Sequence, residues 1–257
     1  GNDMRYMDEK VKASRNLANK LWNASRFIMM NLPDDFKFTG LPENLNIEDK
    51  WIISKFNDLA AAVNDNLDNF ELGVAVSKLY DFIWDVYCDW YIELTKPRIM
   101  AGGETMASAQ AVLVFIMQGM LKLLHPFMPY ITEEIWQTLT DESCPIMLEK
   151  FPVFEEKYSY KEEEEAFEKV IAVIKEIRNR RTEMNIPPSV KANVFIETAD
   201  TALFESCSMF FEKMAFAKEV NVAEKFDIED AVTAVTDSAR AFIPMNELVD
   251  KDKELAR

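Results

Sequence analysis

Apolar residues recur at helical spacing along the first half of the chain. Leu17, Leu21, Ala24 and Ile28 fall on one arc of a helix when successive residues are rotated by about 100°. The same period predicts further helices at about residues 51–67, 70–95, 104–124 and from residue 132 onwards. We expect the first helix to cover about residues 8–31 and the third to stop at Pro97. These five segments predict a helical bundle.

The pattern changes after about residue 153. Residues 154–165 are highly charged and predict a linker, and residues 167–177 form an amphipathic helix that ends before Pro187. Residues 192–197 alternate like a short strand, residues 202–216 are typical of a helix, and residues 231–242 predict one or two more strands. We therefore expect a mainly α chain, with a helical-bundle domain over residues 1–153 and a small α/β domain over residues 154–257.

The composition agrees with this fold class and limits the setting. The chain has 257 residues, of which 49% are hydrophobic, so a sizeable core can form, and only six glycines. Cys88, Cys144 and Cys207 are too few and too far apart for a disulfide framework or a zinc site, which favours a reducing cytoplasm. The most apolar run, residues 111–124, is short and contains polar residues, so we expect no membrane partner.

Charge is unevenly distributed along the chain. The net charge of -16 argues against a polyanionic partner. Residues 1–32, however, contain six Lys or Arg against three Asp or Glu, and residues 175–191 contain five against two, so each segment carries +3. Two basic segments in an acidic chain predict local and modest binding of RNA. The alternative is that both are ordinary solvated helix faces.

Polar side chains of the first helix lie beside its apolar arc. Lys20, Asn23 and Arg26 share this neighbouring arc, and Phe27 lies at the edge between the two. A flat ring, an amide and cations are the groups with which proteins bind unstacked bases and phosphates of single-stranded nucleic acid. An amphipathic helix with a solvated polar face has the same spacing. Spacing alone leaves both readings open.

Candidate catalytic and metal-binding residues are few. Asp81, Asp85 and Asp89 repeat every four residues, which fits a metal-binding row or, as we favour, a solvated or salt-bridged helix face. His125, the single histidine, lies before a Pro-Phe-Met-Pro corner, where we expect a structural role. No serine or cysteine nucleophile motif is present. We expect no catalytic residue and no bound metal.

Several long motifs occur in one order along the chain. They are residues 15–27 (RNLANKLWNASRF), 66–68 (NLD), 79–85 (LYDFIWD), 88–93 (CDWYIE), 96–98 (KPR), 125–136 (HPFMPYITEEIW) and 177–188 (IRNRRTEMNIPP). The first six closely resemble the anticodon-binding domain of the valyl-tRNA synthetases, and the last resembles the opening of that family's small C-terminal domain. The resemblance covers nearly the whole chain.

The resemblance implies a fold, a partner and a site. It implies the helical anticodon-binding domain of class I synthetases, a small α/β domain leading into a truncated coiled-coil arm, and a monomer that binds the tRNA for valine but no DNA. Lys20, Asn23, Arg26 and Phe27 would contact the anticodon. Backbone contacts to the tRNA would come from Arg15, Asn16, Arg178 and Arg181.

The family's two ATP-binding signatures, usually written HIGH and KMSKS, do not occur in this chain. We therefore expect a fragment of a larger cytoplasmic enzyme that uses ATP, with no cofactor in the fragment and no activity of the fragment alone. The alternative is an acidic helical module that binds protein partners through its aromatic surface.

Overall fold

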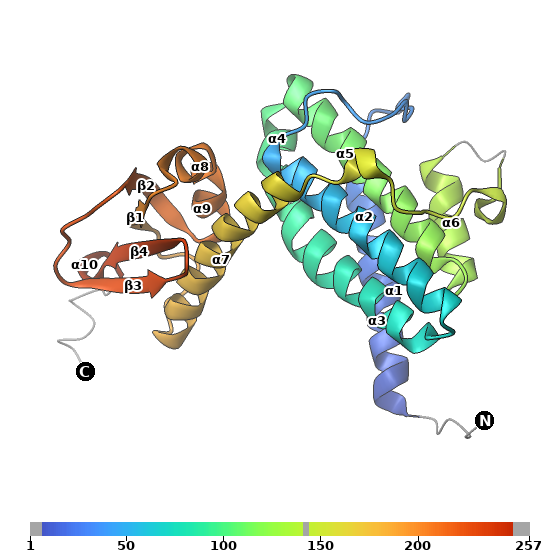
Figure 1. Ribbon diagram of the computed structural model, residues 1–257, viewed down its shortest axis with the longest axis horizontal. Helices are drawn as coiled ribbons and strands as arrows, with labels where there is room; N and C mark the ends of the chain where they lie inside the picture. Colours follow the sequence, from blue (N-terminus) through green and yellow to red (C-terminus); the bar gives the residue numbers. More distant parts are fainter. Residues whose placement is uncertain (1–6, 141–143, 249–257) are drawn as a thin grey trace. The chain divides into compact units, whose positions relative to one another are not determined.

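The computed structural model describes residues 7–140 and 144–248, and the chain divides into two compact units, Gly1–Glu164 and Glu165–Arg257 (Figure 1). The first unit is helical. Its elements are α1 (Asp8–Met30), α2 (Ile47–Asp68), α3 (Leu72–Asp81), the π-helix η1 (Phe82–Tyr91), α4 (Ile92–Ala101), α5 (Gly103–Leu124), α6 (Pro129–Leu139), and the 3-10 turns η2 (Ile146–Leu148) and η3 (Glu156–Tyr158). The fold class predicted from the sequence is confirmed.

The second unit is a small α/β fold. It contains most of α7 (Lys161–Glu183), then β1 (Ala192–Thr198), α8 (Thr201–Ser206), α9 (Ser208–Met214), β2 (Ala217–Ala223), β3 (Ala231–Val235), β4 (Ala239–Pro244) and α10 (Met245–Leu248). The sheet order is β2-β1-β4-β3, with β1 and β2 parallel and the other pairs antiparallel. Strand β2 was not predicted, because as an edge strand it buries few residues and lacks a clear apolar alternation.

The boundary between the units lies after Glu164, whereas the charge pattern placed it after Val153. The charged segment packs against α2. The side chain of Asn57 donates to the carbonyl of Glu155 and accepts from its N–H, at 2.9 and 2.8 Å. Lys50 pairs with Glu163 at 2.7 Å, and Ser54 donates to Glu164. These contacts make the predicted linker part of the helical unit.

Helix α5 supplies much of the core of the helical unit. Twelve of its residues are buried, and Gly119 allows a close approach: a Cβ at this position would lie 2.3 Å from the ring of Phe56 on α2. Among the described residues, α5 has the length and composition of a membrane span, but 61% of its apolar window is buried within the protein. A buried core helix can have the same length and apolar composition as a membrane span.

The helix predicted to stop at Pro97 instead continues to Ala101 through α3, η1 and α4. Proline lacks an N–H and disfavours a helix interior. Here the residues on both sides of it, Leu94, Thr95 and Arg98, are buried, so tertiary packing outweighs the local preference. The helix ends at Gly102, whose φ of 73° suits glycine.

Arg98 makes the most buried ion pairs described in the structure. Its side chain is 3% exposed, and Nη1 donates to Glu48 at 2.8 Å and to Asp49 at 2.7 Å. Nε donates to Thr105 of α5, and the hydroxyl of Tyr91 donates to Asp49 at 2.7 Å. Burial, together with the negative charge of Asp49, raises the pKa of Glu48 even though Arg98 lowers it. The network joins α2, η1, α4 and α5.

Replacing Arg98 with Ala should therefore strongly destabilise the helical unit. Two carboxylates would remain buried without a cation, and breaking a buried pair in this way costs about 3–5 kcal/mol. Urea unfolding followed by helical circular dichroism measures the loss. Adding Asp49→Asn to Arg98→Ala should recover part of it, because one buried charge is then removed. Lys96→Ala, which removes a partly exposed partner of Glu93, is the control and should change stability little. A similar loss in both single variants would contradict the assignment.

The turn between α2 and α3 contains a strained residue. Phe70 has a φ of 59° and is 88% exposed. Its N–H donates to Leu67 O at 3.0 Å, and that of Glu71 donates to Asn66 O at 2.7 Å, which is the Schellman arrangement at a helix end. Glycine is preferred at this position, because a side chain is unfavourable at positive φ.

Phe70→Gly should therefore stabilise the chain, by about 0.5–1 kcal/mol, since backbone strain is relieved and little buried surface is lost. Phe70→Ala removes the same ring but keeps the Cβ, so it is the matched control and should bring no such gain. Thermal unfolding of the three proteins decides between the outcomes. Destabilisation by Phe70→Gly beyond that of Phe70→Ala would show that the strain is absent.

Candidate nucleic-acid interface

Helix α1 buries one face in the helical unit and leaves the neighbouring face in contact with solvent. It packs against η1, α5 and α6. The predicted apolar arc is buried, with Leu17, Leu21, Ala24 and Ile28 each 6% exposed or less. Asn23 and Arg26 are exposed on the adjacent arc. The amphipathic pattern of the sequence therefore placed both faces of α1 correctly.

Lys20 is held against η1 by two contacts. Its Nζ lies 2.6 Å from Oδ1 of Asp89 and 4.6 Å from the ring centroid of Trp84. The Trp84 ring stacks on Tyr80 at 5.6 Å with an interplanar angle of 8°. Asp89 is thus part of a salt bridge, which was one of the two readings of the aspartate row. The cation of Lys20 is therefore only partly available to a ligand.

Phe27 and Arg26 complete the predicted face. Phe27 is half-buried, and Nζ of Lys96 on α4 lies 5.7 Å from its ring centroid. Lys96 in turn pairs with Glu93. Arg26 is exposed and makes no ion pair with the residues that the structure describes. This face therefore combines a partly accessible ring, an exposed amide and an exposed guanidinium.

The predicted backbone contacts differ in their surroundings. Arg15 and Asn16 are exposed near the N-terminal end of α1, and Arg178 is exposed on α7. Arg181 is 3% exposed, and its Nη2 donates to the carbonyls of Pro187, at 3.0 Å, and Val190. It also lies over the ring of Phe216, at 5.4 Å from the centroid.

The expectation of a phosphate contact at Arg181 is therefore corrected: this side chain fixes the segment that follows α7. Burial lowers the pKa of its guanidinium. The sequence contained a signal for this role, because Arg181 follows Ile177 by four residues and so continues the apolar stripe of α7. Arg178, on the exposed side, does not share that stripe.

Other candidate sites contain no obvious reactive chemistry. His125 Nδ1 lies 2.7 Å from the hydroxyl of Thr132 and connects the ends of α5 and α6. Within residues 7–140 and 144–248, no group of three His, Cys, Asp or Glu side chains could hold a metal ion. Burial raises the pKa of the Cys88 thiol to about 12, which disfavours the nucleophilic thiolate.

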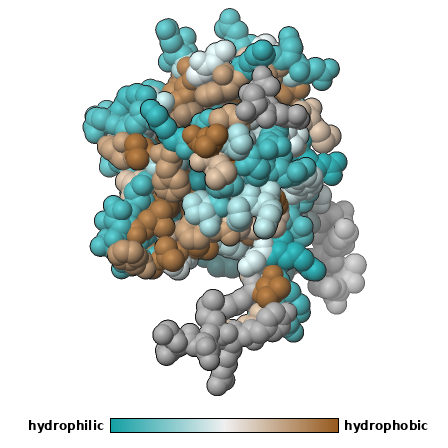
Figure 2. Space-filling model, turned by 90° about the vertical axis from the view of Figure 1, so that its right-hand side faces the viewer, coloured by the Kyte–Doolittle hydropathy of each residue, from teal (hydrophilic) through white to brown (hydrophobic). Residues whose placement is uncertain are grey.

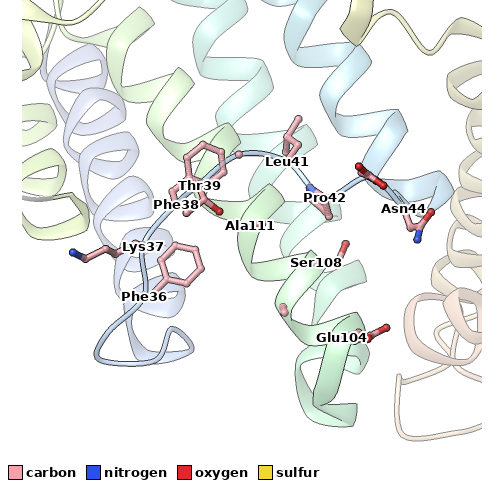
Figure 3. A pocket seen from close by; sticks show the side chains of 13 residues that line it. Phe36, Lys37, Phe38, Thr39, Leu41, Pro42, Asn44, Glu104, Ser108 and Ala111 are labelled. Carbon is pink, nitrogen blue, oxygen red and sulfur yellow. The ribbon is translucent and has the colours of Figure 1, made fainter.

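A pocket of about 520 Å³ lies between residues 36–44 and the N-terminal half of α5 (Figure 3). Phe36 points toward α5, whereas Lys37 points away from it. The other polar residues that line the pocket are Thr39, Glu43, Asn44, Glu104 and Ser108. None of the predicted site residues contributes to it.

Tyr80, Trp84 and Lys96 were not among the residues predicted for this face. Trp84 of η1 contacts Lys20, and Lys96 of α4 contacts Phe27, whereas Tyr80 of α3 stacks on Trp84. The motifs at residues 79–85 and 96–98 contained them, but helical spacing could not show which of their side chains face α1. A π-helix, with i→i+5 hydrogen bonds, changes that spacing between residues 82 and 91.

Comparisons with known proteins agree on a family. The chain is 47% identical to the valine–tRNA ligase of Clostridium acetobutylicum, 44% to that of Clostridium tetani and 41% to that of Carboxydothermus hydrogenoformans. Each comparison covers 100% of this chain but 30% of the relative, so the chain spans under a third of the length of these relatives. The family model described as the anticodon-binding domain of tRNA ligase matches residues 49–196. As this match covers more than half of the chain, the chain belongs to the family of anticodon-binding domains of tRNA ligases.

Proposed function

We propose that this chain is the tRNA-recognition region of a valine–tRNA ligase and that it binds the tRNA for valine. Family membership supports binding to tRNA, and the names of the relatives support valine as the amino acid. In the intact enzyme, ATP would drive attachment of valine to the tRNA. We also propose that this enzyme is a cytoplasmic monomer.

The observation that carries the proposal is the composition of the α1 face. Lys20, Asn23, Arg26 and Phe27 lie within two turns of one helix, with Asn23 and Arg26 exposed. An amide can donate to and accept from base edges, a ring can stack on a base, and a guanidinium binds phosphate or guanine. These groups match an unstacked anticodon loop. The family match begins at residue 49, so α1 lies outside it, whereas the relatives align over the whole chain.

Three further polar residues would contact the tRNA backbone. Arg15 and Asn16 extend the α1 face, and Arg178 is the exposed arginine of the basic segment in the α/β unit. Contacts to phosphates position a protein on nucleic acid without reading its sequence. We therefore assign sequence recognition to the central turns of α1 and positioning to these three residues.

Titration of the 257-residue chain with valine tRNA, followed by fluorescence anisotropy at several salt concentrations, tests the function. We expect binding that weakens with salt and that is tighter for the natural anticodon than for an altered one. Arg26→Ala should reduce the magnitude of the slope of log affinity against log salt by about 0.7 for one lost single-strand phosphate contact. Absence of binding would favour a protein-interaction module instead, whereas equal binding of both tRNAs would contradict recognition of the anticodon.

A second pair of variants separates base stacking from base reading. Phe27→Ala should cost about 1–3 kcal/mol of tRNA affinity if a base stacks on the ring. Asn23→Ala should reduce discrimination between the natural anticodon and single-base variants, because an amide provides directional hydrogen bonds. Melting temperatures provide the control for folding. A large drop in melting temperature for Phe27→Ala, with unchanged affinity of the folded protein, would place this ring in the core and not at the interface.

A further inference from the structure

The pair formed by Lys20 and Asp89 lies within the proposed RNA-binding face. Lys20 belongs to α1 and Asp89 to η1, and the side chains are 30% and 47% exposed. Both are therefore accessible to a ligand that approaches this surface. An ammonium and a carboxylate at 2.6 Å form a neutral pair, so together they attract a distant polyanion little.

The position of Lys20 is fixed from a second direction. Its ammonium lies 4.6 Å from the centroid of Trp84, and Tyr80 stacks on the same indole. The attraction between a cation and a ring adds to the pull of the carboxylate. Lys20 is thus held toward η1, in contrast to Arg26, which makes no ion pair with the described residues.

We propose that Asp89 limits the affinity of this face for RNA by competing with RNA phosphate for the ammonium of Lys20. This inference rests on the proposed function. A phosphate that approaches Lys20 must displace the carboxylate or remain close to it, and like charges repel. Lys20 therefore contributes little to the binding of an arbitrary RNA backbone. Its full contribution requires a ligand whose other contacts, to Asn23, Arg26 and Phe27, hold it in place.

This arrangement lowers affinity and leaves discrimination to the base contacts. Affinity from phosphate contacts is shared by correct and incorrect RNAs, because the backbone is the same in both. A carboxylate that weakens such a contact lowers the affinity for both by a similar factor. Discrimination between RNAs then depends on the contacts of Asn23 and Phe27 with the bases.

The test is Asp89→Asn, which removes the charge and retains the shape and a carbonyl acceptor. For valine tRNA we expect binding about two- to fivefold tighter, the range given by exposed ion pairs. The salt slope should steepen by about 0.7, as for one added single-strand contact. Affinity for a tRNA with an altered anticodon should rise by a similar factor, so the ratio of the two dissociation constants should change little.

Asp85→Asn is the matched control, because Asp85 is exposed on the same helix and makes no ion pair with the described residues. It changes net charge equally but releases no lysine, so it should leave the affinity and the salt slope nearly unchanged. In a Lys20→Ala background, Asp89→Asn should behave like Asp85→Asn. This dependence on Lys20 distinguishes competition from a general change in charge.

Three results would overturn the inference. Equal effects of Asp89→Asn and Asp85→Asn would show only a bulk charge effect. A lower melting temperature for Asp89→Asn with unchanged affinity would show a purely structural salt bridge. Lack of tRNA binding by the unmodified chain would overturn the proposed function as well, whereas normal binding that is sensitive to Arg26→Ala would leave that function intact.

Discussion

Arg98 binds Glu48 and Asp49 in the interior of the helical unit, and the positions of four helices depend on this interaction. Three buried charges are stable together only when each has its partners, so the first turn of α2 and the second half of α4 have little freedom to move apart. Tyr91 and Thr105 bind the same network from η1 and α5. Helix η1, which ends at Tyr91, is thereby fixed where it contacts α1. The proposed RNA-binding face is built on this contact.

Much of the fold could be predicted from the sequence, because burial has a regular period in α1, α2 and α5. The prediction that the helix stops at Pro97 was wrong. Arg98, the next residue, is held in place by two buried carboxylates that are distant in the sequence. Strand β2 was missed because it pairs with β1 through backbone hydrogen bonds, and an edge strand of this kind has no clear apolar pattern in its sequence. The boundary between the units was displaced because Glu163 and Glu164, which suggested a solvated linker, bind Lys50 and Ser54 of α2.

The site was predictable in its residue types but not in its interactions. Helical spacing placed Asn23 and Arg26 at the surface and Leu21 in the core, and the structure agrees. It could not show that Lys20 is paired with a residue 69 positions later in the chain. The same limit applies to Arg181, whose partners follow α7 along a turn. Local sequence indicates which charges are present, whereas tertiary contacts decide which of them a ligand can use.

On the face of the helical unit that lies on the side of α6, apolar patches are separated by hydrophilic side chains (Figure 2). The π-helix η1 also limits which insertions and deletions the helical unit can tolerate. Removing one residue from Phe82–Tyr91 would change the helical register between α3 and α4. Leu79 would remain in the core while Arg98 turned away from its carboxylates. The length of this segment is therefore constrained more strongly than the identity of its exposed residues.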